Sequence, residues 1–153
     1  MRNDAVTRRH EAALRSIHPV FRWRVEAVLR ELANREWQPV VWEGRRTTAE
    51  QAEKVRLGYS KTMGSWHVLS THAIIPAGKD GIDIVHGAAA DIVDRRWEWG
   101  GPCANLNHHF WLSLGTVAKA QGLEWGGDWK KFRDVAHVQM RFVEMAPMKS
   151  ATV

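Results

Sequence analysis

Residues 125–137 read WGGDWKKFRDVAH, a tight glycine-containing loop (125–129) that leads to a histidine. From His137 to Val143 the residues alternate in type, which predicts a half-buried final strand. We expect His137 to face a site from this strand and Asp134, three residues earlier, to reach the same site from the loop. A catalytic zinc ion needs about three protein ligands, an open position for water and a carboxylate to take that water's proton. The pair is compatible with such a site, although this spacing alone is common by chance.

A further acidic residue, Asp91, is embedded in a short apolar segment over residues 88–93 that predicts a buried strand. Burying an unpaired charge is costly, so Asp91 should be matched by a cation, a metal ion or several N–H donors. A solvated aspartate at the end of a strand is the alternative interpretation.

A basic pair, Arg45 and Arg46, lies between Gly44 and a predicted helix over residues 49–57 that Thr47 or Thr48 would cap. Arg46, with Gln51 further along the helix, has the chemistry to clamp a carboxylate or a developing oxyanion. The alternative is a basic helix start that faces solvent.

The remaining pattern predicts an α+β fold with a small, mostly antiparallel sheet flanked by helices. Pro19 begins an amphipathic helix whose apolar positions lie on one face, and residues 39–42 form a short apolar strand. A later helix should run from a cap at Asn105 or Asn107 to about Gln121. Residues 59–85 are predicted to be mostly loop, with a turn-rich insertion over residues 76–81.

The length of 153 residues, with 44% hydrophobic and 25% charged residues, predicts one domain over residues 1–153 with its own core. Within it, residues 1–18 form a partly helical N-terminal extension and residues 146–153 a frayed tail. Apolar runs are far shorter than the roughly 20 residues of a membrane span. The single cysteine, Cys103, excludes an internal disulfide. Met1 is followed by charged residues instead of an apolar segment, which predicts no signal peptide and synthesis in a cytoplasm.

The net charge of +5 favours polyanionic partners, whether nucleic acid, cell wall or anionic membrane. Nine tryptophans also suit a groove that binds a sugar or a peptide. A non-enzymatic module that binds nucleic acid is therefore a competing class of function, but no helix-turn-helix, zinc-finger or RNP signature accompanies the basic residues.

Together the motifs read, in chain order, G-x-R-T-x-x-x-Q, S-x-H, G-x-A-x-D, W-G-G-D-W and D-x-x-H. This order resembles the zinc D-Ala-D-Ala metallopeptidase family, which includes vancomycin-resistance D,D-peptidases and phage L-alanyl-D-glutamate endolysins. The resemblance spans residues 19–143, and residues 125–137 point to the endolysin branch. It implies the hedgehog/DD-peptidase fold, with the zinc site carried by the sheet.

The resemblance also implies roles for individual residues. Asp91 and His137 match two zinc ligands, and Asp134 matches the general base. Arg46 matches the residue that stabilises the tetrahedral oxyanion. Gln51 and Trp129, which lie in the same motifs, are implied as supporting residues.

The first zinc histidine is harder to assign, because the ungapped family pattern would place it at position 84, which is Ile84. An insertion must separate the histidine from Gly87. His72 in Ser70-Thr71-His72 requires the shorter insertion and is our prediction. His67 and His86 are the alternatives.

The resemblance thus predicts a zinc-dependent peptidase that cleaves the stem peptide of bacterial peptidoglycan, at the L-Ala–D-Glu bond. D-Ala–D-Ala cleavage at the same site is the alternative, and a wall-binding module without catalysis is a further one. As a lysin, the chain would be a monomer that does not insert into a membrane. It would be made in the host bacterial cytoplasm and would act on the wall in the periplasm after release.

Overall fold

The computed structural model describes residues 4–46, 48–59 and 87–141 of the chain. The predicted loop and insertion between residues 60 and 86, and the predicted tail, lie outside the described residues. The helices are α1 (Ala5–Ser16), α2 (Pro19–Asn34), α3 (Thr48–Arg56) and α4 (His109–Ala120). The strands are β1 (Pro39–Glu43), β2 (Ala89–Asp94), β3 (Glu124–Trp125) and β4 (His137–Gln139), and short 3₁₀ turns span Gly101–Ala104 and Gly126–Asp128.

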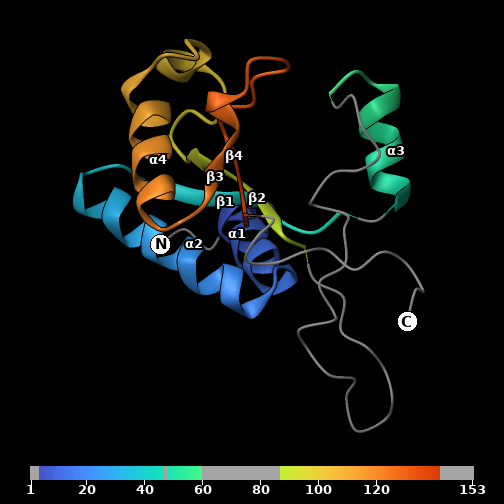
Figure 1. Cartoon of the computed structure of the whole chain (residues 1–153), viewed down its shortest axis with the longest axis horizontal. Helices are drawn as coiled ribbons and strands as arrows, with labels where there is room; N and C mark the ends of the chain where they lie inside the picture. Colours follow the sequence, from blue (N-terminus) through green and yellow to red (C-terminus); the bar gives the residue numbers. More distant parts are fainter. Residues whose placement is uncertain (1–3, 47, 60–86, 142–153) are drawn as a thin grey trace, which may run out of the picture.

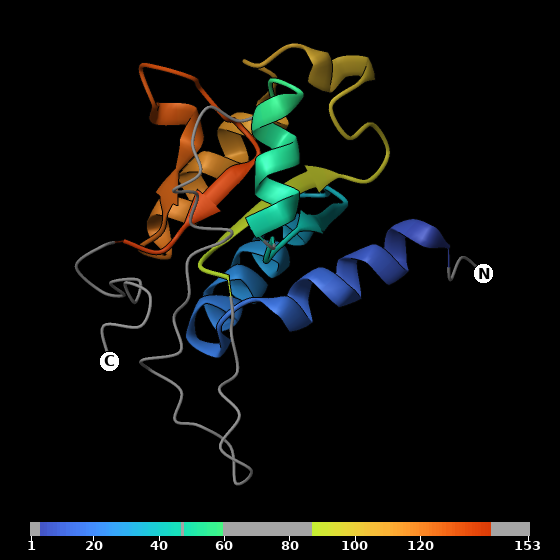
Figure 2. The same ribbon diagram turned by 90° about the vertical axis from the view of Figure 1, so that its right-hand side faces the viewer.

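The strands form one antiparallel sheet in the order β1-β2-β4-β3, which confirms the predicted α+β class. Figure 1 shows α2 and α4 on one side of this sheet and α3 on the other, and Figure 2 shows α3 standing in front of the strands. Strand β2 lies between β1 and β4, and all six of its residues are buried. A polar side chain on β2 is therefore enclosed by neighbouring strands and must find its partners there.

Helix α2 begins as the sequence predicts. Pro19 occupies the first turn, where a missing N–H costs nothing, and the His18 ring nitrogen Nδ1 accepts a 3.1 Å hydrogen bond from the backbone N–H of Val20. Its apolar face is fully buried and forms one wall of the core: Phe21, Val25, Val28 and Leu32. The predicted N-terminal extension contains helix α1, which packs against β1 and contributes Ala13 and Leu14 to the core.

Most boundaries lie within one residue of the prediction, and three differ in a way that matters for the local structure. Helix α4 is capped by His108, whose Nδ1 accepts from the Phe110 N–H at 3.1 Å, while Asn105 accepts from the Asn107 N–H in the preceding turn. Strand β4 ends at Gln139, although the Met140 N–H still donates to the carbonyl of Ala88 in the same register. The start of the predicted loop over residues 125–129 belongs to strand β3. Among the residues that the structure describes, no helix has the length and apolar character to cross a membrane.

Candidate active site

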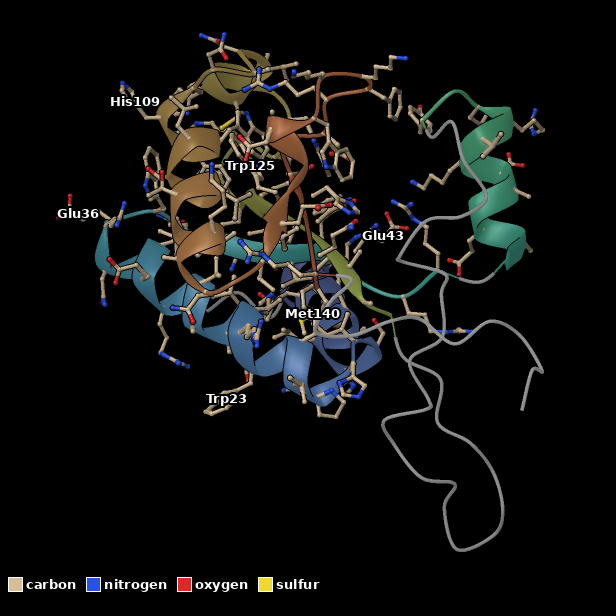
Figure 3. All side chains as sticks on the ribbon, in the orientation of Figure 1. Trp23, Glu36, Glu43, His109, Trp125 and Met140 are labelled. Carbon is tan, nitrogen blue, oxygen red and sulfur yellow. The ribbon has the colours of Figure 1, made fainter. Side chains whose placement is uncertain are left out.

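Three polar residues stand side by side across the sheet. Asp91 of β2 pairs directly with Glu43 of β1 and with His137 of β4. The β1–β2 register shifts between Val41 and Glu43, and this bulge at Trp42 brings Glu43 level with Asp91. In Figure 3, Glu43 lies on the side of the sheet that faces α3. Asp91 is only 6% exposed, so the alternative of a solvated strand-end aspartate is wrong.

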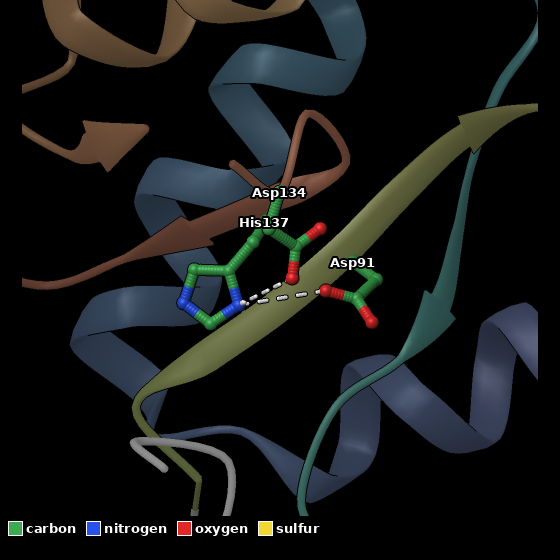
Figure 4. Close-up of side chains that lie close together, drawn as sticks. All are labelled: Asp91, Asp134 and His137. Carbon is green, nitrogen blue, oxygen red and sulfur yellow. Dashed lines mark ion pairs between the residues drawn. The ribbon is translucent and has the colours of Figure 1, made fainter. Parts of the chain in front are cut away.

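The imidazole of His137 has a defined orientation (Figure 4). Its Nδ1 lies 3.6 Å from Asp91 Oδ1 and 3.9 Å from Asp134 Oδ2. Its Nε2 lies 2.7 Å from Oε1 of Gln139, which is also buried. A hydrogen on Nε2 that is donated to Gln139 leaves the lone pair of Nδ1 directed toward the two carboxylates.

Asp134 reaches the site from the loop that follows β3. The Asp134 N–H donates to the carbonyl of Gly126 at 3.0 Å, and the Trp129 N–H donates to the same carbonyl at 3.2 Å. A side chain at position 126 would collide with the backbone of Asp134, which explains the glycine there. The ring of Trp129 packs on His137 with a centroid separation of 4.9 Å. The loop therefore positions the carboxylate of Asp134 and also supports the imidazole of His137.

Trp125 anchors the same loop to the core. Its Nε1 donates to the carbonyl of Val135 at 2.7 Å, and its ring packs against two glycines, Gly115 of α4 and Gly127 of the loop. Either glycine would strike the indole if it carried a side chain. The first half of the W-G-G-D-W motif is thus explained by packing of the loop against α4.

Arg46 lies beside the carboxylates and is only 8% exposed, so the alternative of a solvent-facing basic helix start is wrong for this residue. Its Nε and Nη2 donate to the two carboxylate oxygens of Glu43 at 2.7 and 2.9 Å, and Nη2 lies 3.4 Å from Asp91 Oδ2. Burial alone would lower the pKa of Arg46, but the hydrogen bonds to Glu43 and the charges of Asp91, Glu43 and Asp134 raise it. The guanidinium is therefore a permanent charge of the site.

The site attracts a cation. Burial alone would lower the pKa of His137, but the neighbouring carboxylate of Asp91 and the charge of Asp134 raise it, so the carboxylates favour positive charge at Nδ1. Ligand atoms of Asp91, Asp134 and His137 all lie within 4.8 Å of one another. Two ligands of one tetrahedral metal ion lie about 3.4 Å apart, close to the 3.6 Å between His137 and Asp91. The donors and their spacing fit a metal ion.

A groove of about 480 Å³ opens over these residues. Its polar lining includes Asp91, Asp134 and Arg46, and its other lining residues include four aromatic side chains: Trp42, Tyr59, Trp99 and Phe132. The groove has the size of a small-ligand site and opens onto the carboxylates.

Four of the residues singled out in the sequence therefore converge, namely Arg46, Asp91, Asp134 and His137, and Trp129 supports them. Gln51 belongs to helix α3. The candidate first ligand His72 and its alternatives His67 and His86 lie outside the described residues.

Sequence reasoning missed Glu43 and Gln139. Gln139 had a signal, because a residue two positions after His137 on a strand faces the same side. Glu43 had none, since its position depends on the bulge at Trp42.

Paired carboxylates and a histidine around one point in an open groove are typical of metal-dependent hydrolases. The sequence pattern of the peptidase family described as D-alanyl-D-alanine carboxypeptidase matches residues 63–140, about half of the chain. The chain belongs to this family and is a metallopeptidase.

Named relatives agree with this membership. The chain is 28% identical over 131 residues to the peptidoglycan L-alanyl-D-glutamate endopeptidase CwlK of Bacillus subtilis, covering 81% of this chain and 73% of that protein. It is 30% identical over 105 residues to the L-alanyl-D-glutamate peptidase of Listeria phage A118, covering 67% of this chain but only 30% of the phage protein. The crystal structure of the Serratia marcescens L-Ala D-Glu endopeptidase ChiX superposes with a TM-score of 0.59 at 28% identity and 89% coverage of both chains.

Proposed function

We propose that this metallopeptidase is a zinc-dependent peptidoglycan hydrolase that cleaves the L-Ala–D-Glu bond of the stem peptide. The observation that carries the proposal is the convergence of Asp91, Asp134 and His137 around one point, where the two carboxylates line the groove. The substrate is supported by the names of the three relatives, all of which are L-alanyl-D-glutamate peptidases. Action on the bacterial wall follows from the same substrate.

In this proposal, zinc would be held by Nδ1 of His137, a carboxylate oxygen of Asp91 and the imidazole of His72. The geometry of the first two supports their part, and the S-x-H pattern supports His72. The chemistry that bound zinc would supply is Lewis acidity, which lowers the pKa of a coordinated water toward ~7. The Nε2–H of His137 donates a hydrogen bond to Oε1 of Gln139, and this bond keeps the ring in the orientation needed for metal binding.

Asp134 is proposed as the general base. Its side chain is 36% exposed, whereas that of Asp91 is 9% exposed, so Asp134 is the carboxylate that water and substrate reach. Oδ2 of Asp134 takes a proton from the attacking water and returns it to the leaving amine as the peptide bond breaks. Arg46, held by Glu43 at the edge of the groove, stabilises the negative charge that develops on the carbonyl oxygen.

The test is digestion of purified sacculi followed by mass spectrometry of the soluble products. L-Ala–D-Glu cleavage releases peptides that begin with D-Glu, whereas D-Ala–D-Ala cleavage releases free D-alanine. We expect the first product, its loss on chelation and its return with zinc. Free D-alanine as the product would move the assignment to the carboxypeptidase reaction, which the description of the family favours.

Variants separate the proposed roles. Asp134→Ala should keep its metal and lose about 10²–10⁴-fold in turnover. Asp128→Ala is the matched control, because Asp128 is an exposed aspartate of the same loop that pairs with Lys119 at 3.0 Å. His137→Ala and His72→Ala should both lose metal, while His67→Ala and His86→Ala should keep it. Metal loss in His67→Ala instead of His72→Ala would move the first ligand to position 67.

A further inference from the structure

Phe132 adopts a backbone conformation that its side chain disfavours. Its φ is +50°, in the left-handed region that glycine and asparagine occupy more readily than a bulky residue. Its side chain is also 42% exposed, so it is not among the core residues that pack the fold. An exposed aromatic ring in a strained conformation indicates a constraint other than stability.

Residues next to Phe132 make polar contacts that hold the loop. Arg133 donates from Nε to the carbonyl of Gly127 at 2.8 Å and from Nη1 to Oδ1 of Asn107 at 3.1 Å. The Asp134 N–H closes the loop on Gly126. These contacts explain how the left-handed conformation persists, but they do not require an aromatic side chain at position 132.

The place of Phe132 in the groove gives a reason for an aromatic side chain at this position. Phe132 lines the groove, two residues before the proposed base Asp134. Trp42 and Trp99 line the same groove and meet edge to face with their centroids 5.9 Å apart. Trp99 and Phe132 remain 41% and 42% exposed, so apolar surface is available to a ligand beside the carboxylates.

We propose that Phe132 is a substrate-binding residue that packs on the apolar surface of the stem peptide next to the scissile bond. The proposal rests on the proposed function and adds to it a residue that binds the substrate. Phe132 lines the same groove as the Trp42–Trp99 pair, so that a bound peptide covers aromatic surface that is otherwise exposed to water. Covering an aromatic side chain of this size corresponds to about a tenfold to hundredfold change in binding.

The test compares Phe132→Gly with Phe132→Tyr on a defined soluble muropeptide. Glycine removes the ring and accepts the positive φ, so we expect an unchanged or raised Tm, unchanged metal content, and a KM raised about tenfold to hundredfold. Phe132→Tyr keeps the ring and should restore the KM to within about threefold of wild type. The matched control is Glu36→Gly, because Glu36 also has a positive φ of 71° but follows α2 outside the groove. It should raise the Tm and leave KM and kcat unchanged.

An unchanged KM in Phe132→Gly, with a wild-type enzyme that cleaves the muropeptide, would overturn this inference and leave the proposed function standing. A fall in Tm that accounts for the lost activity would overturn it as well, since it would show that the ring serves the fold. A wild-type enzyme that does not cleave the muropeptide would refute the proposed function and this inference together.

Discussion

Gln139→Leu should weaken zinc binding without removing a metal ligand. In the wild-type protein the buried Gln139 places Oε1 2.7 Å from Nε2 of His137. The leucine side chain has a similar size but offers no acceptor. The metal-free variant then favours the tautomer with its hydrogen on Nδ1, because that hydrogen faces the negative carboxylates of Asp91 and Asp134, 3.6 and 3.9 Å away. Binding zinc through Nδ1 moves that hydrogen to a buried Nε2 that has lost its acceptor at position 139.

The size of the effect follows from that buried group. Leaving a buried N–H without its hydrogen bond costs about 1–3 kcal/mol, which corresponds to about a tenfold to hundredfold weaker zinc affinity. Loss of an outer hydrogen-bond partner of a metal-bound histidine typically costs the same factor. Gln139→Glu keeps an acceptor at this position and should stay close to wild type.

The assay is competition for zinc with a chromophoric chelator at a fixed pH, with the Tm gained on adding zinc as a second readout. The control is Gln121→Leu, which makes the same change at the end of α4, outside the site. An unchanged zinc Kd in Gln139→Leu would refute the reasoning, because the tautomer would then not depend on Gln139. An equal loss in Gln121→Leu would show a general effect on stability instead.

Two further predictions concern stability. Asp94 is fully buried and accepts from the Gln38 N–H and from Arg96 at 2.7–3.0 Å; burial alone would raise the pKa of Asp94, but these hydrogen bonds and the Arg96 charge lower it. Asp94→Asn should lower the free energy of unfolding at pH 7 by about 1–3 kcal/mol. Urea titrations should show this difference shrinking below pH ~4, because the carboxylate of the unfolded wild-type chain is protonated there before that of the folded protein. A difference that stays constant down to pH 2.5 would contradict this. Gly115→Ala would press a methyl group into the Trp125 ring and should cost about 1–3 kcal/mol in the same titrations, whereas Thr116→Ala on the exposed side of α4 should cost less; equal losses would argue against the packing account.

The features that the sequence predicted best depend on residues close together in the chain. The apolar face of α2 recurs with the helical period, and Pro19 marks the start of the helix. Asp134 and His137 are three residues apart, so one short turn is enough to bring them to the same point. The apolar run around Asp91 is too short for a helix that spans the core, and it predicts a buried strand, as observed for β2.

The features that were missed depend on register and on competing caps. Glu43 reaches Asp91 only because a bulge at Trp42 shifts β1 by one position, and one-residue shifts leave little trace in a five-residue strand. At α4, Asn105 has an ordinary capping side chain, but it is used in the turn before the helix, and the ring of His108 accepts the helical N–H instead. Local propensity ranks the candidates for a cap, while the path of the preceding chain selects among them.

The same contrast explains why the proposed metal ligands and base were easier to predict than the residues that hold them. Metal binding and proton transfer require carboxylates and imidazoles, so residues with these proposed roles are visible in the sequence. Glu43 and Gln139 act by holding Arg46 and His137, and a glutamate or glutamine at a strand end has many ordinary explanations. Their roles become visible only when the sheet places each within hydrogen-bonding distance of its partner. Supporting residues of a metallopeptidase site are therefore best sought among polar side chains that are buried on the same face of the sheet as the ligands.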